Sequence, residues 1–372
     1  MNGFEKDDQS VVRYRKVLVY FQIFTLDSES GPYFHDNDRK EIRMIYENLV
    51  LDEERALYGI RDCEVRDCVF AGKADGESAL KECRDIKVTD CKFELRYPLW
   101  HVHHASISGS TLTETCRAAL WYDKEVSISH SQLGGIKALR ECDQTELVEC
   151  EINSTEFGWF CRGLTMQHCK LQGEYPFLKS RDMQIEKLDM KGKYSFQYVE
   201  NVTIKHSNLD TKDAFWHSKN VTVYDSIIKG EYLGWYSENL KLVRCKIIGT
   251  QPLCYAKGLV LEDCEMEQTD LSFENSDVKA TVRGEILSVK NPISEKIMAD
   301  HIAVSYTHLD VYKRQSIDRL ICPFLIIVNI AIINGNCFHI ILISRNKTVQ
   351  IAFCALFHFH ILKAGKNAFF FK

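Results

Sequence analysis

The sequence predicts an all-β protein: a single-stranded, right-handed parallel β-helix (β-solenoid) of about twelve coils, covering residues 44–303. Two observations predict it. Residues of one kind recur every 19 positions, and apolar and polar residues alternate within each repeat. A repeat of this size cannot bury its apolar face alone, so consecutive repeats must stack into one continuous core. Right-handed winding is expected because parallel crossover connections are almost always right-handed.

Small residues form the first repeated column. Its steps are 19 residues, except for one of 23 and one of 21 near the start. Two residues later runs an apolar column from Phe70 to Met266, and pairs such as Val202 and Ile204 precede it. This period of two predicts short strands, three per coil, half buried against the core and joined by turns. The small column comprises Cys68, Cys91, Ser110, Ser131, Cys150, Cys169, Leu188, Ser207, Ser226, Cys245 and Cys264.

The cysteines of this column are expected to be thiols. The chain has 15 cysteines but no Cys-x-x-Cys pair, and its N-terminus is a poor secretory signal because acidic residues interrupt it. A reducing compartment therefore follows, and the expected localisation is cytoplasmic. Stacked pairs such as Cys150 and Cys169 come within disulfide range across one coil, but we expect buried thiols that pack as small hydrophobes.

All five tryptophans fall in one column of the repeat, which we call the tryptophan column. The residues just before it are uncharged, which predicts that they point inward and that the tryptophans line the outside of a sheet. The sequence therefore predicts a ligand-binding surface made of Trp100, Trp121, Arg140, Trp159, Gln197, Trp216 and Trp235. The whole column reads Tyr58, Lys81, Trp100, Trp121, Arg140, Trp159, Leu178, Gln197, Trp216, Trp235, Cys254 and Phe273.

Such a row of rings with Arg and Gln is typical of a surface that binds a glycan or another extended ligand, by ring stacking and directed hydrogen bonds. The best prediction is therefore non-enzymatic binding of an oligosaccharide. One alternative is a structural protein that forms a homo-oligomer through this face, since an apolar strip of this length should be covered or occupied. The other is a carbohydrate-active lyase or hydrolase, which would use Arg140, Asp213 and His217.

The charged residues favour the non-enzymatic interpretation. The carboxylates of Glu156, Glu174, Asp213 and Glu231 alternate with lysines at 193 and 212, a pattern of charge pairing along the stack. We predict no metal site and no cofactor, because no ligand cluster or glycine-rich phosphate loop stands out. The chain carries −5 overall and residues 316–372 about +5, so residues 1–315 carry about −10. This acidic body gives no reason to expect nucleic-acid or membrane binding.

Several motifs resemble one family. ERALYG (54–59), CRAALWYD (116–123), DAFWHSKNV (213–221), GEYLGWYSENL (230–240) and NPISEKIMAD (291–300) are similar to a bacterial family catalogued only as a domain of unknown function, DUF3737. The resemblance covers residues 44–302 and implies a single β-helix with no established activity, so it supplies no catalytic residues. Its members usually begin shortly before ERALYG, so the resemblance implies a native start at Met44, with residues 1–43 either upstream read-through or a short N-terminal extension.

The tail departs from the family. VSYTHLDVYKRQ (304–315) resembles a translated transposon or sequencing-adapter junction, and the sequence after it abandons the repeat. We therefore expect residues 304–372 to be a chimeric segment, disordered or poorly packed, and an inverted repeat in the encoding DNA is the observation that tests this. The alternative is a genuine hydrophobic tail or membrane anchor, although the apolar run 320–333 is shorter than a membrane span requires.

Overall fold

The computed structural model describes residues 44–72, 77–306, 329–333, 337–344 and 347–353. The predicted N-terminal extension, residues 1–43, lies outside the described residues, as do residues 307–328 of the predicted chimeric segment. The chain divides into two units, Met1–Val311 and Tyr312–Lys372. Each unit is described by itself.

The first unit contains strands β1 to β25, all paired in parallel. Their bounds are β1 Met44–Glu47, β2 Val50–Leu51, β3 Arg61–Arg66, β4 Val69–Phe70, β5 Arg84–Thr89, β6 Lys92–Phe93, β7 His103–Ser108, β8 Thr111–Leu112, β9 Lys124–Ser129, β10 Gln132–Gly134, β11 Asp143–Val148, β12 Glu151–Asn153, β13 Thr165–Gln167, β14 Lys170–Glu174, β15 Arg181–Glu186, β16 Asp189–Lys193, β17 Glu200–Lys205, β18 Asn208–Lys212, β19 Lys219–Tyr224, β20 Ile227–Lys229, β21 Lys241–Val243, β22 Lys246–Ile248, β23 Leu259–Glu267, β24 Asp277–Lys290 and β25 Ser294–Tyr306.

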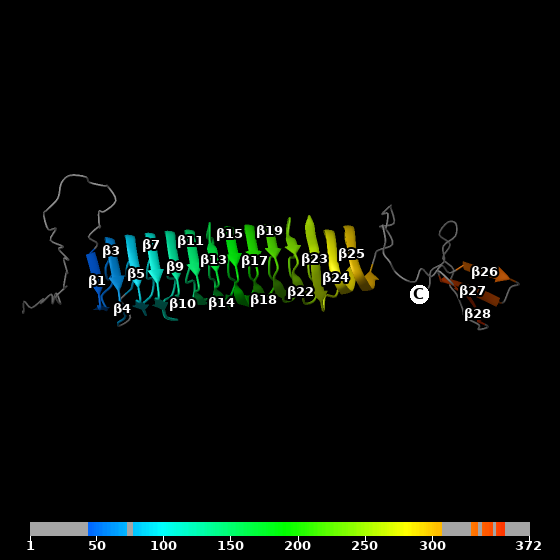
Figure 1. Ribbon diagram of the computed structural model, residues 1–372, viewed down its shortest axis with the longest axis horizontal. Coiled ribbons are helices and arrows are strands. Elements are labelled where there is room, and N and C mark those ends of the chain that lie inside the picture. Colours follow the sequence, from blue (N-terminus) through cyan, green and yellow to red (C-terminus); the bar gives the residue numbers. More distant parts are fainter. Residues whose placement is uncertain (1–43, 73–76, 307–328, 334–336, 345–346, 354–372) are drawn as a thin grey trace, which may run out of the picture. The chain divides into compact units, whose positions relative to one another are not determined.

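These strands confirm the predicted right-handed parallel β-solenoid (Figure 1). Up to β21, each strand pairs with the strand two further along the chain, as β15 does with β17 and β16 with β18, so that two stacks of strands run side by side along the axis. From β22 on, consecutive strands pair, because β23, β24 and β25 each extend through both stacks. The register places Met183 beside Val202 and Met190 beside Leu209, one 19-residue step apart. There are about 14 coils, slightly more than the predicted twelve, because the first coil and the last two carry weaker sequence repeats.

The third predicted strand of each coil is wrong. The segment that contains the tryptophan column is a turn in most coils, with alternate residues in the left-handed region: Tyr175, Phe177 and Lys179 have φ of 56°, 66° and 55°. Non-glycine residues adopt this region uncommonly. The same three positions recur in the next coil, at Tyr194, Phe196 and Tyr198. Each coil therefore has two strands and one left-handed turn segment.

One buried core fills the solenoid from end to end. The residue before the tryptophan column points inward, as predicted, and the rings of Phe177, Phe196 and Phe215 stack with centroids 4.8 Å and 5.0 Å apart. All three are fully buried. Stacking like on like places the Phe196 ring between two aromatic neighbours, which adds to the stabilisation from burial alone.

The small column lies at a corner between the two strands, where a side chain must satisfy a backbone carbonyl. The Ser207 hydroxyl donates to Lys205 O at 2.8 Å, and the Cys150 thiol lies 3.4 Å from Val148 O in the same geometry. Ser and Cys are therefore interchangeable here. The prediction of buried thiols is confirmed for the twelve cysteines of residues 63–264, all of which are buried and none of which forms a disulfide.

The second unit contains three described strands, β26 Asn329–Ile333, β27 Cys337–Ser344 and β28 Lys347–Phe353. They form an antiparallel sheet in the order β26, β27, β28. The antiparallel order differs from the parallel pairing of the first unit.

Candidate functional site

The turn segments place the tryptophan column on the outside of the solenoid, half buried. Backbone bridges join Trp121 to Arg140 and Arg140 to Trp159, so these residues are true neighbours along the stack. Two members of the predicted column depart from the rest. Cys254 is fully buried, and the 20-residue step of that coil moves Phe273 to the inward column and puts Glu274 in its place.

Four of the five indole N–H groups bond to the next coil, and the fifth, that of Trp121, is buried with no hydrogen-bond partner. Trp159 Nε1 donates to Tyr175 O at 2.5 Å, Trp216 Nε1 to Tyr232 O at 2.6 Å and Trp235 Nε1 to Gln251 O at 2.8 Å. Trp100 donates to Ala118 O, and Gln197 Nε2 lies 3.4 Å from Asp213 O in the equivalent place. A donor already used in this way is not free for a ligand. The column therefore ties each coil to the following one.

The ring faces of the column are also occupied. Trp216 and Trp235 stack at 5.4 Å with an angle of 4° between their planes. The Arg140 guanidinium fills the space between Trp121 and Trp159, at 5.0 Å and 5.4 Å from the two rings. A sugar needs an open ring face to stack upon. The faces of these tryptophans instead contact residues of the neighbouring coils, by π-stacking and cation–π contacts that hold the coils together.

Several exposed aromatic side chains lie one residue after the tryptophan column, a position that sequence reasoning missed; Tyr58 in the column and Tyr175 before it are exposed as well. We call the set after the column the exposed row: His101, Tyr122, Phe160, Tyr198, His217, Tyr236 and Tyr255. Tyr198 is 48% exposed and Tyr236 44%. A strand would have turned these positions inward, together with the phenylalanines two residues earlier. The left-handed turn instead projects them outward.

Four members of the exposed row form one continuous stack. Tyr198 lies 4.8 Å from His217, His217 5.0 Å from Tyr236, and Tyr236 4.9 Å from Tyr255, with angles of 8° to 12° between the planes. The Lys179 ammonium extends the stack, 5.9 Å from the Tyr198 ring. The ring faces cover one another, and their edges are what a ligand on this face would meet.

The three residues of the enzyme alternative do not meet. Arg140 lies four 19-residue steps before Trp216, about 19 Å along the axis, since adjacent strands are about 4.8 Å apart. The Asp213 side chain is 4% exposed and burial raises the pKa of its carboxyl, whereas the His217 ring is exposed between two tyrosines. The predicted charge pairing is present: Lys193 bonds Glu174 at 2.9 Å, and Lys212 bonds Glu231 at 2.8 Å.

Within the described residues, no group of three or more His, Cys, Asp or Glu side chains is arranged to hold a metal ion. The histidines near the first tryptophan are used locally, with His101 stacked on Tyr122 at 5.0 Å and His104 2.7 Å from Glu125. A search of the same residues for a helix long and apolar enough to span a membrane finds none.

Solved structures share only the general fold. The A-module of a mannuronan C-5 epimerase from Azotobacter vinelandii aligns with a TM-score of 0.29 and 10% identity, covering 64% of this chain and 89% of that one. A surface adhesin of Streptococcus pneumoniae aligns with a TM-score of 0.29 and 8% identity, covering 78% and 77%. A periplasmic alginate epimerase aligns with a TM-score of 0.27 and 8% identity, covering 67% of this chain and 78% of that one. At these scores the likenesses carry no functional argument.

Among curated proteins, no relative matches. Among protein families, residues 44–317 match one, and this range contains every strand of the solenoid. The chain therefore belongs to the family described as "Protein of unknown function (DUF3737)".

Proposed function

We propose that the protein is a non-enzymatic binding protein for an extended, hydroxyl-rich ligand of the oligosaccharide class, held along the exposed row. The observation that carries this proposal is the stack of Tyr198, His217, Tyr236 and Tyr255, whose polar edges repeat at the spacing of the coils. The proposal differs from the one drawn from the sequence in its contacts. The ligand meets ring edges, not the faces of the tryptophans.

The rigid stack favours binding because little side-chain freedom is left to lose. Tyrosine contributes a large contact area and one hydroxyl that donates and accepts. A ring held between two others is already ordered before the ligand arrives, which lowers the entropic cost of association. A sugar polymer lying along the axis would meet an equivalent group at each coil.

Tryptophan fluorescence gives the direct test. Trp235 lies 5.4 Å from the Tyr255 ring and 6.3 Å from the Tyr236 ring, so it reports on a ligand at this row. The full chain is titrated with a panel of oligosaccharides, and we expect a saturable change. The double variant Tyr198→Phe/Tyr236→Phe keeps the rings and removes two hydroxyls, and we expect weaker binding.

Tyr224→Phe is the matched control, since Tyr224 lies at the end of β19, away from the exposed row. It should bind like the unchanged chain. No response to any sugar, or equal loss in the control, would contradict the proposal.

Self-association through the same row is the second candidate. Tyr122 and Phe160 are 37% and 39% exposed, and aromatic side chains are enriched where proteins meet. Light scattering separates the two candidates. A mass that rises with protein concentration and falls in the Tyr198→Ser/Tyr236→Ser variant favours assembly, and a constant mass removes this candidate.

We also propose that the protein works in a reducing compartment such as the cytoplasm. What supports this is the burial of the twelve cysteines in residues 63–264, none of which forms a disulfide. Fractionation of cells that express the full chain tests it.

A further inference from the structure

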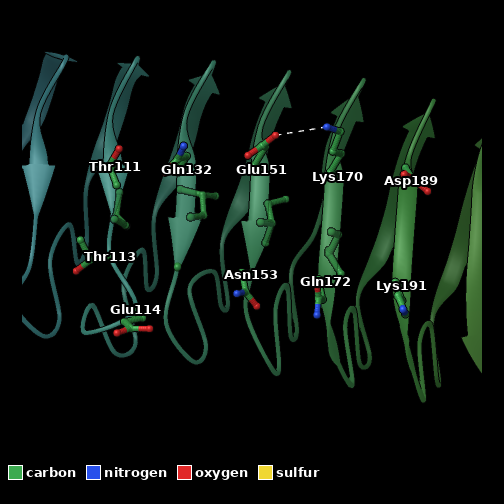
Figure 2. A pocket seen from close by; sticks show the side chains of 15 residues that line it. Thr111, Thr113, Glu114, Gln132, Glu151, Asn153, Lys170, Gln172, Asp189 and Lys191 are labelled. Carbon is green, nitrogen blue, oxygen red and sulfur yellow. Dashed lines mark hydrogen bonds and ion pairs between the residues drawn. The ribbon is translucent and has the colours of Figure 1, made fainter.

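A groove runs across the outer face of the second stack of strands, on β8, β10, β12, β14 and β16 (Figure 2). Its volume is about 700 Å³. Thr111, Gln132, Glu151, Lys170 and Asp189 form one row along it, in register from coil to coil. None of the exposed row lines this groove, so it is a separate surface.

Local sequence explains why the surface is hollow here. Gly134 leaves a gap in the second row of side chains, between Thr113 and Asn153, and a Cβ at this position would come within 2.8 Å of Leu112 O. The coil before it has two extra residues, and this excursion carries Glu114 to the edge of the groove. The Cys116 thiol holds the excursion in place by donating to Phe93 O at 2.9 Å.

The groove is lined by polar side chains that lack partners. Elsewhere on the surface, three asparagines bond to one another one coil apart: Asn220 to Asn201 at 3.1 Å, and Asn239 to Asn220 at 3.0 Å. In the groove, within residues 44–72 and 77–306, five side chains make no hydrogen bond or ion pair: Glu114, Gln132, Asn153, Gln172 and Lys191. Asn153 and Gln172 are register partners and still do not bond to each other.

Charge in the groove is nearly balanced. Three carboxylates (Glu114, Glu151, Asp189) face two ammonium groups (Lys170, Lys191), a net of −1. Lys170 and Glu151 are 3.5 Å apart and both largely exposed, a contact that solvent screens. Such a lining selects neither an anion nor a cation. The amides each offer donors and an acceptor, the complement of paired sugar hydroxyls.

We infer that this groove is a second binding site, for a neutral oligosaccharide. Five coils span about 19 Å, since four spacings of about 4.8 Å separate them, and this length takes several sugar rings in an extended chain. The ligand's hydroxyls would take the place of the missing neighbours of Gln132, Asn153 and Gln172. The inference goes beyond the proposed function because it uses different residues on a different side of the coil.

Isothermal titration of the full chain with neutral gluco-, manno- and xylo-oligosaccharides tests the inference. We expect Asn153→Ala/Gln172→Ala to weaken the binding of at least one sugar about tenfold or more, because several hydrogen bonds are lost. The matched control is Gln167→Ala/Gln184→Ala, two outward amides on β13 and β15 of the other stack. Circular dichroism and the unfolding midpoint check that each variant folds.

The outcomes separate the two sites. Weaker sugar binding by Asn153→Ala/Gln172→Ala, with the affinity of the control and of Tyr198→Phe/Tyr236→Phe unchanged, supports the groove site. This holds whether or not the exposed row binds a ligand. Three results overturn the inference: no neutral sugar binds, the groove variant binds normally, or an acidic oligosaccharide binds more tightly than every neutral one.

Discussion

Asp123 is a buried carboxylic acid in the core, and replacing it should stabilise the protein. Its side chain is 1% exposed. One oxygen accepts the Val102 N–H at 2.8 Å, and the other, Oδ2, has no partner. Burial raises the pKa of this carboxyl well above its usual range, with a smaller contribution from Cys161. Equivalent positions in other coils are occupied by Cys142, Ser180 and other small residues.

The change we choose is Asp123→Ser, because serine already performs this role at the equivalent position three coils further along, Ser180. The Ser180 hydroxyl accepts the Cys161 N–H at 2.9 Å, just as Asp123 accepts that of Val102. The substitution should therefore keep the hydrogen bond and remove the unpaired Oδ2. A carboxyl that stays protonated in the folded state while the unfolded chain ionises costs about 1.4 kcal/mol per pH unit above about 3.9.

The raised pKa of Asp123 determines the direction in which stability changes with pH. The folded state holds a proton that the unfolded state releases, so the unchanged protein loses stability as pH rises above about 4 and recovers it as pH falls. The gain from Asp123→Ser should therefore be small at pH 4 and grow toward a ceiling of about 4 kcal/mol at pH 7, three units higher. At about 2–4 °C per kcal/mol, this is a readily measured rise in Tm.

Thermal unfolding followed by circular dichroism from pH 4 to pH 8 is the assay, with Asp123→Asn as the companion variant. The asparagine removes the titration but leaves a buried amide nitrogen without an acceptor, so its gain at pH 7 should be smaller. A difference in Tm between Asp123→Ser and the unchanged protein that does not vary with pH would refute the reasoning.

Four further outcomes follow from the same structure. A thiol reagent should label at most three of the 15 cysteines in the folded chain, because the other twelve are buried. Burial also raises the pKa of Cys83 and of Cys245 to about 12, so these thiols stay protonated and unreactive. Complete labelling without denaturant would contradict this. Gly230→Ala should lower the free energy of unfolding by about 1–3 kcal/mol, because its φ of 149° suits only glycine and a Cβ would lie 2.2 Å from Thr211 O. The control, Gly59→Ala, has open space around its Cβ and should lower the free energy of unfolding less in the same urea titration. Phe196→Ala should lower the free energy of unfolding by about 3–5 kcal/mol, because it opens a cavity between Phe177 and Phe215. An unchanged urea midpoint would show that the ring stack does not contribute to stability. Arg244→Ala should leave the midpoint unchanged, because its pair with Asp225 at 2.6 Å lies in solvent, and a clear drop would show that these surface pairs act as a network.

The columns that face the core could be predicted from the sequence, because burial restricts them to a few residue types. A position that must be small and satisfy a carbonyl is filled by Cys or Ser, and a position that faces the axis by Phe or Leu. Such columns show the period directly. Their weakening at β24 and β25, where the 20-residue step shifts the pattern, explains both the undercounted coils and the misplaced Phe273.

The turn segment could not be predicted in this way. Buried Phe177 and half-buried Leu178 alternate as two residues of a strand would, and nothing in the residue types of Tyr175, Phe177 and Lys179 favours a positive φ. The conformation is imposed by the coils above and below. The exposed row and the covered ring faces of the tryptophans both follow from it, and for this reason the surface that we propose lies one residue after the one that the sequence predicts.

The excursion at residues 113–116 has a consequence for engineering. Two residues are added there, yet Leu112 and Leu133 remain opposite each other and the strands on both sides keep their partners. Extra chain at this corner is thus accommodated without shifting anything downstream. Foreign loops grafted at the same corner of other coils would be displayed at regular intervals along the solenoid, which makes it a scaffold for arranging several recognition loops in a line.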